Sequence, residues 1–264
     1  MDTPLASIVI LTHNDVEYFR ECLASVRART DVPYEVIVVD NSSTGAAVSA
    51  LGRLCRGPNI RLIRNAENRF FAAGNNQGIR AARGRYVVLL NADAVVGLQW
   101  LSRLIAWAQA DPEVGLVAPV TNSASGLQYI AAPGYHGVAD FAKFSWAWAQ
   151  VHAGRSREAH RLIAFCLLIK REVIDCVGLL DERFGPGGYE DYDYCLRVRQ
   201  AGFKLLLAED VFVHHYGAKG YEGMDYSHHR RINREILARK WSQFVLHALD
   251  DVDKAIENLR AVPR

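Results

Sequence analysis

The feature that most constrains the fold of this chain is a regular alternation of short apolar runs with segments of helical spacing. Residues Ser7–Thr12 and Glu35–Asp40 are nearly continuous runs of Val, Ile and Leu, which is typical of strands buried on both faces of a sheet. Between them, residues 16–28 repeat apolar side chains at helical intervals. The alternation continues with strands expected at 60–64, 86–90 and 115–119 and helices expected at 46–56, 74–82 and 98–110. It predicts an α/β fold with a doubly wound, mainly parallel sheet and right-handed crossovers.

Polar residues follow three of the expected strands. Thr12-His13-Asn14, Asp40-Asn41 and Asn91-Ala92-Asp93 each come at the end of an apolar run. Ligands of open parallel sheets bind beyond the carboxyl ends of the strands, so we expect a site at this edge. Asp93 offers a hard oxygen ligand for Mg²⁺ or Mn²⁺, although an Asp here also caps helices and forms turns. Asp40 could accept hydrogen bonds from a base or ribose, or form an Asx-turn with the serines that follow it.

Three carboxylates crowd together at Glu190, Asp191 and Asp193, at the start of a helix expected to end at Gly202. Like charges this close cost free energy unless a cation, an arginine or a proton offsets them. The first turn of a helix favours anions and would hold a general base firmly. The alternative is an ordinary acidic helix start in which Asp193 pairs with Arg197.

Two further segments carry side chains suited to a site. His214 and His215 follow an apolar run, where one of them could be a metal ligand or both could serve packing. Residues 68–78 combine glycines with three amides but match neither a P-loop nor the GxGxxG pattern. These amides could bind a ribose or fix neighbouring loops.

Composition narrows the class of protein. The chain has 264 residues and a net charge of +2, which gives no strong attraction to nucleic acid. Its five cysteines form no CxxC pair, so we expect reduced thiols. The first residues lack the basic region of a signal peptide, and no apolar run is long enough to span a bilayer. These observations predict a cytoplasmic protein.

The length suits one large α/β domain with a helical appendage. We expect a domain at 1–223, divided into halves at 1–119 and 120–223, followed by a C-terminal helical extension at 224–264. The aromatic-rich residues 141–152, which include Trp146, are either local core or a sugar-stacking surface. Basic residues at 230–240 fit either a solvated helix face or peripheral contact with an anionic membrane surface.

Six motifs in order resemble the family-2 glycosyltransferases, with rhamnosyltransferase-like character, over about residues 5–245. They are residues 7–14, Val38-Val39-Asp40-Asn41-Ser42-Ser43, Asn68 to Gly78, Leu89-Leu90-Asn91-Ala92-Asp93, Gly178 to Arg197 with Glu190-Asp191-Tyr192-Asp193, and His215-Tyr216-Gly217. The resemblance implies the GT-A fold, a UDP-, dTDP- or GDP-linked sugar donor, a divalent metal (Mn²⁺ or Mg²⁺) and inversion at the anomeric carbon.

The resemblance also implies that 1–119 is the nucleotide-sugar-binding half and 120–223 the acceptor and catalytic half, and it implies roles for individual residues. The donor nucleotide is expected at Thr12, Asn14, Asp40, Asn41, Asn76, Asn91 and Asp93; the metal at Asp93 and His215; the acceptor at Glu190 and Trp146; and the general base at Asp191. Two positions depart from the family pattern. Asn91-Ala92-Asp93 has one acid where a DxD-type motif has two, and Phe70 stands where a glycine is common.

The resulting hypothesis is an inverting hexosyltransferase-type enzyme that moves a sugar to a hydroxyl of a glycan, lipid-linked or other acceptor in one displacement. A non-catalytic sugar-nucleotide or glycan-binding module is the alternative favoured by the missing first acid. A nucleotidyltransferase would share the layout and the metal, but it would require a glycine-rich basic loop after the first strand.

Overall fold

The strands of the computed structural model follow the predicted apolar runs closely. The structure describes residues 3–131, 134–217 and 226–241. Its strands are β1 (Ala6–Thr12), β2 (Tyr34–Asp40), β3 (Ile60–Arg64), β4 (Tyr86–Asn91), β5 (Ala94–Val95), β6 (Val114–Val120), β7 (Ser156–Ala159), β8 (Cys166–Lys170), β9 (Lys204–Phe212) and β10 (His214–His215). Strands β1, β2 and β4 are apolar at almost every position and are buried on both faces, as expected for strands inside a doubly wound sheet.

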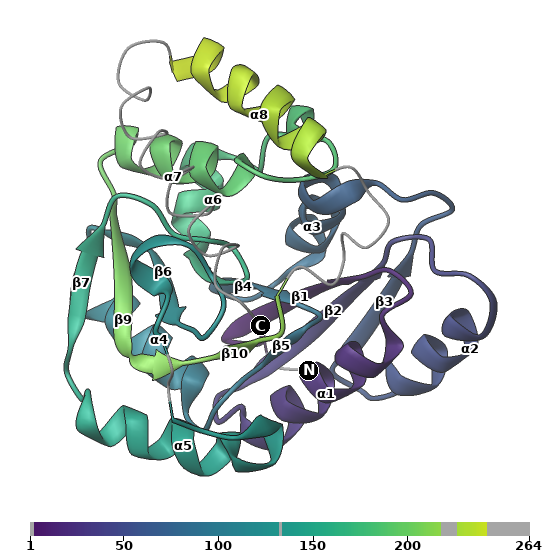
Figure 1. The fold of residues 1–264 in the computed structure, drawn as a ribbon, viewed down its shortest axis with the longest axis horizontal. Coiled ribbons are helices and arrows are strands. Elements are labelled where there is room, and N and C mark those ends of the chain that lie inside the picture. The colour runs from purple at the N-terminus through teal and green to yellow at the C-terminus, as the bar shows by residue number, and fades with distance from the viewer. Residues whose placement is uncertain (1–2, 132–133, 218–225, 242–264) are drawn as a thin grey trace.

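Eight strands form the main sheet, in the order β3-β2-β1-β4-β8-β6-β9-β7 (Figure 1). Neighbours from β3 to β4 are parallel, and β6 is parallel to β9. Strands β8 and β7 run antiparallel to their neighbours. A separate two-stranded sheet joins β5 to β10. The prediction of a mainly parallel α/β sheet is confirmed.

Helices cover both faces of the sheet. They are α1 (Val16–Arg29), α2 (Gly45–Leu54), α3 (Phe70–Ala81), α4 (Trp100–Ala110), α5 (Gly137–Val151), α6 (Arg171–Val177), α7 (Glu190–Gln200) and α8 (Tyr226–Trp241), with short 3₁₀ turns at Gly126–Gln128 and Glu182–Phe184. Alternate residues of the long strands enter opposite cores, so Ile8 and Ile10 share one core with residues of α1 and α4, whereas Val9 belongs to the other core with residues of α3 and α7.

Helix α3 lies close to β1 because two of its residues are glycines. A Cβ on Gly78 would lie 2.2 Å from Val9 Cγ1, and one on Gly74 would lie 2.4 Å from Leu11 Cδ1. The helix begins earlier than the predicted residue 74, since the Asn68 side chain accepts from the Phe70 amide at 2.9 Å. Phe70, at the position where a glycine is common, has a φ of +61°. The loop therefore keeps the left-handed conformation without the glycine.

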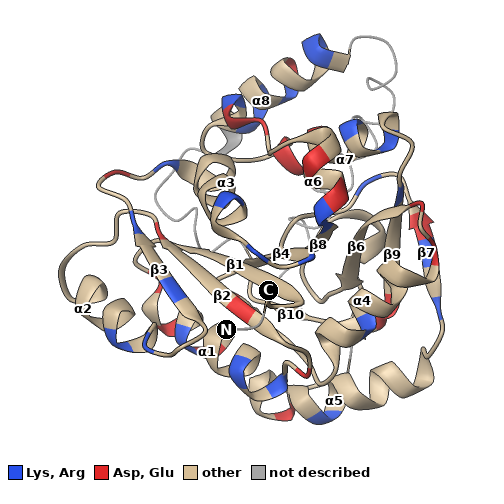
Figure 2. Cartoon of the chain, turned by 180° about the vertical axis from the view of Figure 1, so that it is seen from behind, with Lys and Arg blue, Asp and Glu red and all other residues tan. Residues whose placement is uncertain are grey.

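Helix α8 packs on the main domain through a third small core, formed by Leu237 with Phe184, Tyr189 and Tyr192. Figure 1 shows α8 lying beside α7 at the edge of the molecule. Its charges are of both signs, as Figure 2 shows, and Arg239 pairs with Glu235 at 3.3 Å. Residues 242–264 of the expected extension lie outside the described residues. Within the part of the chain that is described, no helix combines the length and apolarity that crossing a membrane requires.

Candidate active site

Asp93 and His215 lie against each other although they are far apart in the sequence. Asp93 lies between β4 and β5, and His215 ends β10. The antiparallel pairing of β5 with β10 sets His215 opposite Ala94, and the Tyr216 amide donates to the backbone carbonyl of Asp93 at 3.0 Å. His215 Nε2 lies 3.2 Å from Asp93 Oδ1. The fold thus brings the two expected metal ligands into one buried position.

The imidazole of His215 is oriented by contacts on its other sides. Its Nδ1 donates to the Ser123 carbonyl at 2.8 Å, which leaves Nε2 facing the Asp93 carboxylate. Phe165 stacks on the ring with a centroid distance of 5.0 Å. Burial lowers the pKa of His215, but the hydrogen bond with Asp93 and the negative charge of Asp93 outweigh burial, so the pKa lies above its ordinary value.

These two side chains suit a hard divalent cation that also binds substrate. A histidine nitrogen and a carboxylate can hold Mn²⁺ or Mg²⁺, with phosphate oxygens and water completing the coordination. Among the described residues, no group of three or more His, Cys, Asp or Glu side chains converges on one point. Asn91 Nδ2 lies 3.3 Å from His215 Nε2, at the same position. The residues present therefore fit a cation shared with a diphosphate.

The second part of the site is the start of α7, where Asp191 lies. Its Oδ1 accepts from the Tyr192 amide at 2.7 Å, and its Oδ2 accepts from the Ala164 amide at 3.4 Å. Burial raises the pKa of Asp191 above its ordinary value, although the positive charge of Arg161 opposes the rise. A carboxylate whose pKa is raised toward neutrality is well matched to accept a proton from a hydroxyl.

Glu190 lies beside Asp191 and is only 5% exposed. Its Oε2 has no hydrogen-bond partner within the described parts of the chain. Burial, together with the charge of Asp191, raises the pKa of Glu190 to about 8, while hydrogen bonds from the backbone of Glu190 and Gly188 oppose the rise. Two neighbouring carboxyl groups with raised pKa values are a frequent property of functional sites.

A short stretch of backbone, Ala164–Phe165, connects the two parts of the site. The Ala164 amide donates to Asp191, and the Phe165 ring covers His215. The Phe165 carbonyl accepts from the Asn91 amide at 2.8 Å, at the end of β4. The candidate base and the candidate metal ligands are therefore held next to the same two residues. This is an arrangement in which one substrate could contact both.

Comparison with known proteins decides the family. A family model described as "Glycosyl transferase family 2" matches residues 7–178, which is more than half of the chain. The chain belongs to glycosyl transferase family 2.

Relatives of this family 2 chain include proteins of very different length. An uncharacterised protein of Sinorhizobium fredii is 32% identical over 255 residues, which cover 90% of this chain and 28% of that protein. This chain therefore spans less than a third of that relative. The N-acetylglucosaminyl-diphospho-decaprenol L-rhamnosyltransferase of Mycobacterium tuberculosis is 26% identical over 241 residues, which cover 82% of this chain and 77% of the relative.

Among solved structures, a mannosyltransferase from Pyrobaculum calidifontis in complex with GDP-Man and Mn²⁺ matches with a TM-score of 0.63 and 25% identity. The match covers 89% of this chain and 61% of that one. It confirms the GT-A fold that the sequence motifs imply.

At the expected nucleotide end of this family 2 chain, Thr12 and Asp40 lie opposite each other at the ends of β1 and β2. Thr12 Oγ1 is buried and has no hydrogen-bond partner among the described residues. Asp40 Oδ1 accepts from the Ser43 amide at 2.9 Å, so the Asx-turn considered above is present. Asp40 Oδ2 lies 3.8 Å from Arg64 Nε. The Asn14 amide donates to Ser43 Oγ at 2.8 Å, which ties the loops after β1 and β2 together.

Asn41 and Asn76, also expected at the nucleotide, have both ends of their amides engaged by the protein. Asn41 donates to Asn68 Oδ1 at 2.6 Å and accepts from the Arg69 amide at 2.9 Å. Asn76 donates to the Leu180 carbonyl at 2.9 Å and accepts from the Leu180 amide at 3.0 Å. In this structure both asparagines fix loops.

Trp146 lies on α5 and is 42% exposed, so its indole is open to solvent. The preceding Ser145 is buried. Among the described residues, no hydrogen bond or ring contact joins Trp146 to Asp191. A role for Trp146 at the acceptor remains a prediction.

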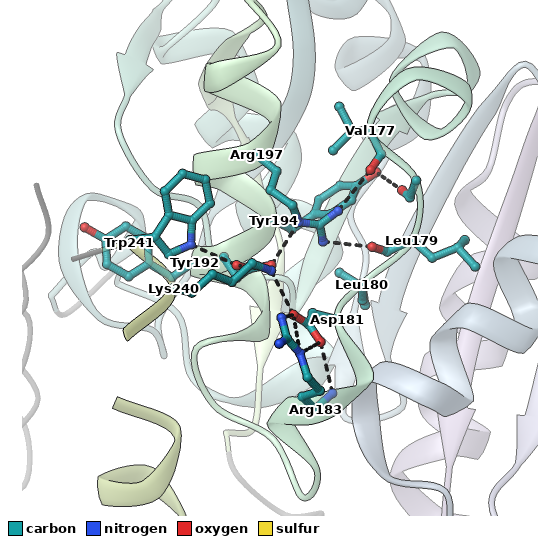
Figure 3. A network of polar contacts seen from close by, with 12 residues as sticks. Val177, Leu179, Leu180, Asp181, Arg183, Tyr192, Tyr194, Arg197, Lys240 and Trp241 are labelled. Carbon is teal, nitrogen blue, oxygen red and sulfur yellow. Dashed lines mark hydrogen bonds and ion pairs between the residues drawn. The ribbon is translucent and has the colours of Figure 1, made fainter. Parts of the chain in front are cut away.

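Asp193 belongs to a structural network that includes Arg197. This pair was the alternative considered above for the acidic cluster. Its Oδ2 lies 2.9 Å from Arg197 Nε, and its Oδ1 is contacted by Lys240 Nζ at 2.8 Å and Trp241 Nε1 at 2.9 Å (Figure 3). Lys240 also reaches Asp181 at 2.8 Å. Asp193 is completely buried by these contacts, so the three acids of the cluster divide into two at the site and one in the scaffold.

Three residues that support the site escaped sequence reasoning. Asn122 Oδ1 accepts from the His215 amide at 2.9 Å, and its Nδ2 donates to the His215 carbonyl at 3.0 Å. Gln128 Oε1 accepts from the Ile163 amide at 2.6 Å, just before the stretch that connects the two parts. Arg161 lies over the Tyr192 ring at 5.7 Å. Of these three residues, only Asn122 could have been suspected from the sequence. It comes shortly after the end of β6, just as Asn91 stands at the end of β4.

Proposed function

We propose that this family 2 chain carries the catalytic domain of an inverting glycosyltransferase. Its donor is a nucleotide-diphosphate sugar bound at the ends of β1, β2 and β4, and its acceptor is a hydroxyl of a glycan or of a lipid-linked sugar. Transfer is of the hexosyl type, as the names of the rhamnosyltransferase and the mannosyltransferase above indicate for those two proteins. The observation that carries the proposal is that Asp191 and the Asp93–His215 pair flank the same two residues, Ala164–Phe165.

Asp191 is the proposed general base. As the acceptor hydroxyl attacks, Asp191 takes its proton, and the hydroxyl oxygen forms the new bond to the anomeric carbon. The bond from that carbon to the diphosphate oxygen breaks, and the nucleoside diphosphate leaves with the electron pair. Attack from the side opposite the leaving group inverts the anomeric configuration. Glu190, held beside the base with one oxygen unpartnered, is proposed to contact the acceptor.

Asp93 and His215 would hold Mn²⁺ or Mg²⁺ against the donor diphosphate. When bound, the cation would supply positive charge to offset the charge that develops on the leaving group. The protein orients this pair through Ser123, Asn122 and Phe165. Thr12 and Asp40 are proposed to contact the nucleoside, because Thr12 Oγ1 is a buried hydroxyl with no partner among the described residues.

The relative from Mycobacterium tuberculosis is named for a diphospho-decaprenol-linked acceptor. We extend only the chemical class to this chain: a sugar acceptor that is free or attached to a lipid. Peripheral contact of α8 with an anionic membrane surface on the cytoplasmic side stays a prediction. Its basic residues are interspersed with Glu235, so the helix is not uniformly positive.

The test is a panel of UDP-, dTDP- and GDP-linked sugars incubated with the protein and Mn²⁺, with release of nucleoside diphosphate as the readout. We expect turnover of at least one donor, and its loss by a factor of about 10³ or more in Asp191→Asn with nucleoside diphosphate binding retained. Asp175→Asn, an exposed acid on α6, is the matched control and should keep full activity.

Four outcomes would contradict the proposal or part of it. Normal turnover by Asp191→Asn would exclude Asp191 as the base. Tight binding of donors without turnover would support a binding module, and release of pyrophosphate would support a nucleotidyltransferase. Once an acceptor is known, NMR of the product reports the anomeric configuration, and retention would exclude a single displacement.

A further inference from the structure

Asn233 of α8 contacts the loop that leads into the candidate base. Its side chain is 3% exposed. Its Nδ2 lies 2.7 Å from the Phe184 carbonyl, 3.0 Å from the Gly187 carbonyl and 3.1 Å from the Gly188 carbonyl. Three carbonyl oxygens converging on one amide nitrogen require a donor at this point. A side chain from the end of the described chain thus holds a loop more than forty positions earlier in the sequence.

The loop that Asn233 holds has an unusual backbone conformation. Gly185, Gly187 and Gly188 have φ values of +51°, +121° and +93°, and Tyr189 has a φ of +77°. A left-handed conformation is costly for a residue with a Cβ such as Tyr189, and it persists only where the surroundings enforce it. Tyr189 immediately precedes Glu190 and Asp191, at the first turn of α7. The conformation of this loop therefore sets the direction in which both carboxyl groups point.

We propose that Asn233 is a positioning residue that holds the 184–189 loop so that Asp191 is aligned with the acceptor hydroxyl. The role rests on the proposed function of Asp191. An asparagine suits it because the amide NH₂ can donate to several carbonyls, whereas an aspartate would face the same oxygens with negative charge. An alanine would remove this donor from the carbonyls of Gly187 and Gly188 and would leave the Phe184 carbonyl with only the Gly187 amide at 3.2 Å among the described residues.

Helix α8 has other anchors, so loss of this amide need not detach it. Lys240 bridges Asp181 and Asp193, and Trp241 donates to Asp193 (Figure 3). Leu237 is completely buried in the third core. Lys240 and Trp241 lie at the C-terminal end of α8, about two turns beyond Asn233, whereas Leu237 packs on Phe184 and Tyr189 of the same loop. We therefore expect Asn233 variants to fold with α8 in place and the loop released.

The donor site gives a second way to separate positioning from general damage. Apart from Asn76 on α3, the expected donor residues lie at the ends of β1, β2 and β4, and among the described residues Asn233 bonds to carbonyls of the 184–188 loop and to none of these donor residues. Misplacing a base by about 1 Å costs roughly 10²-fold in rate. Asn233→Ala and Asn233→Asp should therefore lower kcat by about 10- to 100-fold and leave the dissociation constant of the corresponding nucleoside diphosphate within about 2-fold.

The experiment combines kinetics with hydrogen exchange. Kinetics use the donor that the wild-type protein turns over, and exchange is followed by mass spectrometry in peptides covering residues 184–194. Exchange there should be faster in Asn233→Ala than in wild type, with the strands of the main sheet unchanged. Glu235→Ala, an exposed position on the same helix, is the control and should match wild type in both measurements. In an Asp191→Asn background, Asn233→Ala should cause no further loss of the residual rate.

Each result decides between a positioning role and its absence. Unchanged kcat in Asn233→Ala would overturn the proposal, as would an equal loss of rate in the Asp191→Asn background. A large rise in the nucleoside diphosphate dissociation constant would point to general damage and also overturn it. If wild-type protein turns over no donor, the proposed function itself fails, whatever the exchange shows. Turnover by wild type with normal Asn233 variants refutes only the role of Asn233.

Discussion

Replacing Glu190 with glutamine tests whether the buried carboxyl beside Asp191 holds a proton in the folded protein. Burial and the charge of Asp191 raise the pKa of Glu190 from 4.5 to about 8. The folded state binds this proton more tightly than the unfolded state does. The contribution of Glu190 to stability is therefore full below about pH 4.5 and is lost as the pH rises toward about 8. At 1.36 kcal/mol per pKa unit, the difference amounts to about 5 kcal/mol.

A glutamine keeps the shape of the side chain and removes the titration. Movement of a charged Glu190 toward water reduces the cost of its ionisation in wild type, so we expect a measured effect of about 2 to 3 kcal/mol. Relative to wild type, Glu190→Gln should gain this amount of unfolding free energy between pH 5 and pH 9. The new amide NH₂ lacks a partner and costs about 1 kcal/mol. That cost is the same at every pH and cancels in the comparison.

The assay is urea unfolding of the metal-free protein in EDTA at pH 5, 7 and 9. Glu67→Gln, at an exposed position, is the matched control and should differ from wild type by less than about 0.5 kcal/mol at each pH. The reasoning is refuted if the difference between Glu190→Gln and wild type stays constant within about 0.5 kcal/mol from pH 5 to pH 9. Such a result would mean that ionising Glu190 costs no more free energy in the folded protein than in the unfolded chain.

Three further substitutions test the scaffold of the site. Asn122→Ala, which frees the backbone of His215, should weaken Mn²⁺ binding in the presence of nucleoside diphosphate by about 10- to 100-fold in an electron paramagnetic resonance titration; unchanged affinity would exclude its role. Arg197→Met should lower the unfolding free energy by about 3 kcal/mol, because Asp193 is completely buried and its Oδ2 would lose the arginine that it contacts; a loss under about 1 kcal/mol would contradict this. Gly78→Ala should cost about 1 to 3 kcal/mol in urea unfolding, since its Cβ would meet Val9, and a stabilised variant would show that α3 can move away.

Much of the sheet could be predicted because strands buried on both faces leave a continuous apolar signal. Residues 7–12, 35–40, 60–64 and 86–90 were expected as strands and form β1 to β4 with small differences at their ends. Strand direction could not be obtained in this way. Residues 162–169 form a largely apolar run that fits a strand of either direction, and β8 within that run is antiparallel to both neighbours. Direction depends on long-range connections that a local pattern does not contain.

The site was partly predictable for a different reason. Asp93 and His215 were paired through a resemblance in the order of motifs, and the contact between β5 and β10 brings them within 3.2 Å. Amides were harder to interpret, because the same side chain binds a ribose or a backbone equally well. Asn76 holds both backbone groups of Leu180, and nothing in its neighbours along the sequence indicates this. Asn233 gave no signal at all, since its three partners belong to a loop distant in the sequence.

The single acid of Asn91-Ala92-Asp93 is consistent with a cation site that the substrate completes. The Asp93 carboxylate faces His215 Nε2 at 3.2 Å, and the side-chain Nδ2 of Asn91 lies 3.3 Å from the same nitrogen. A second carboxylate at position 91 would place two negative charges beside one histidine, which destabilises a buried site unless a cation offsets them. With asparagine there, the pair is satisfied in the folded protein before any ligand arrives. We therefore expect diphosphate oxygens to supply most of the cation affinity, so that the donor and the cation bind as a unit.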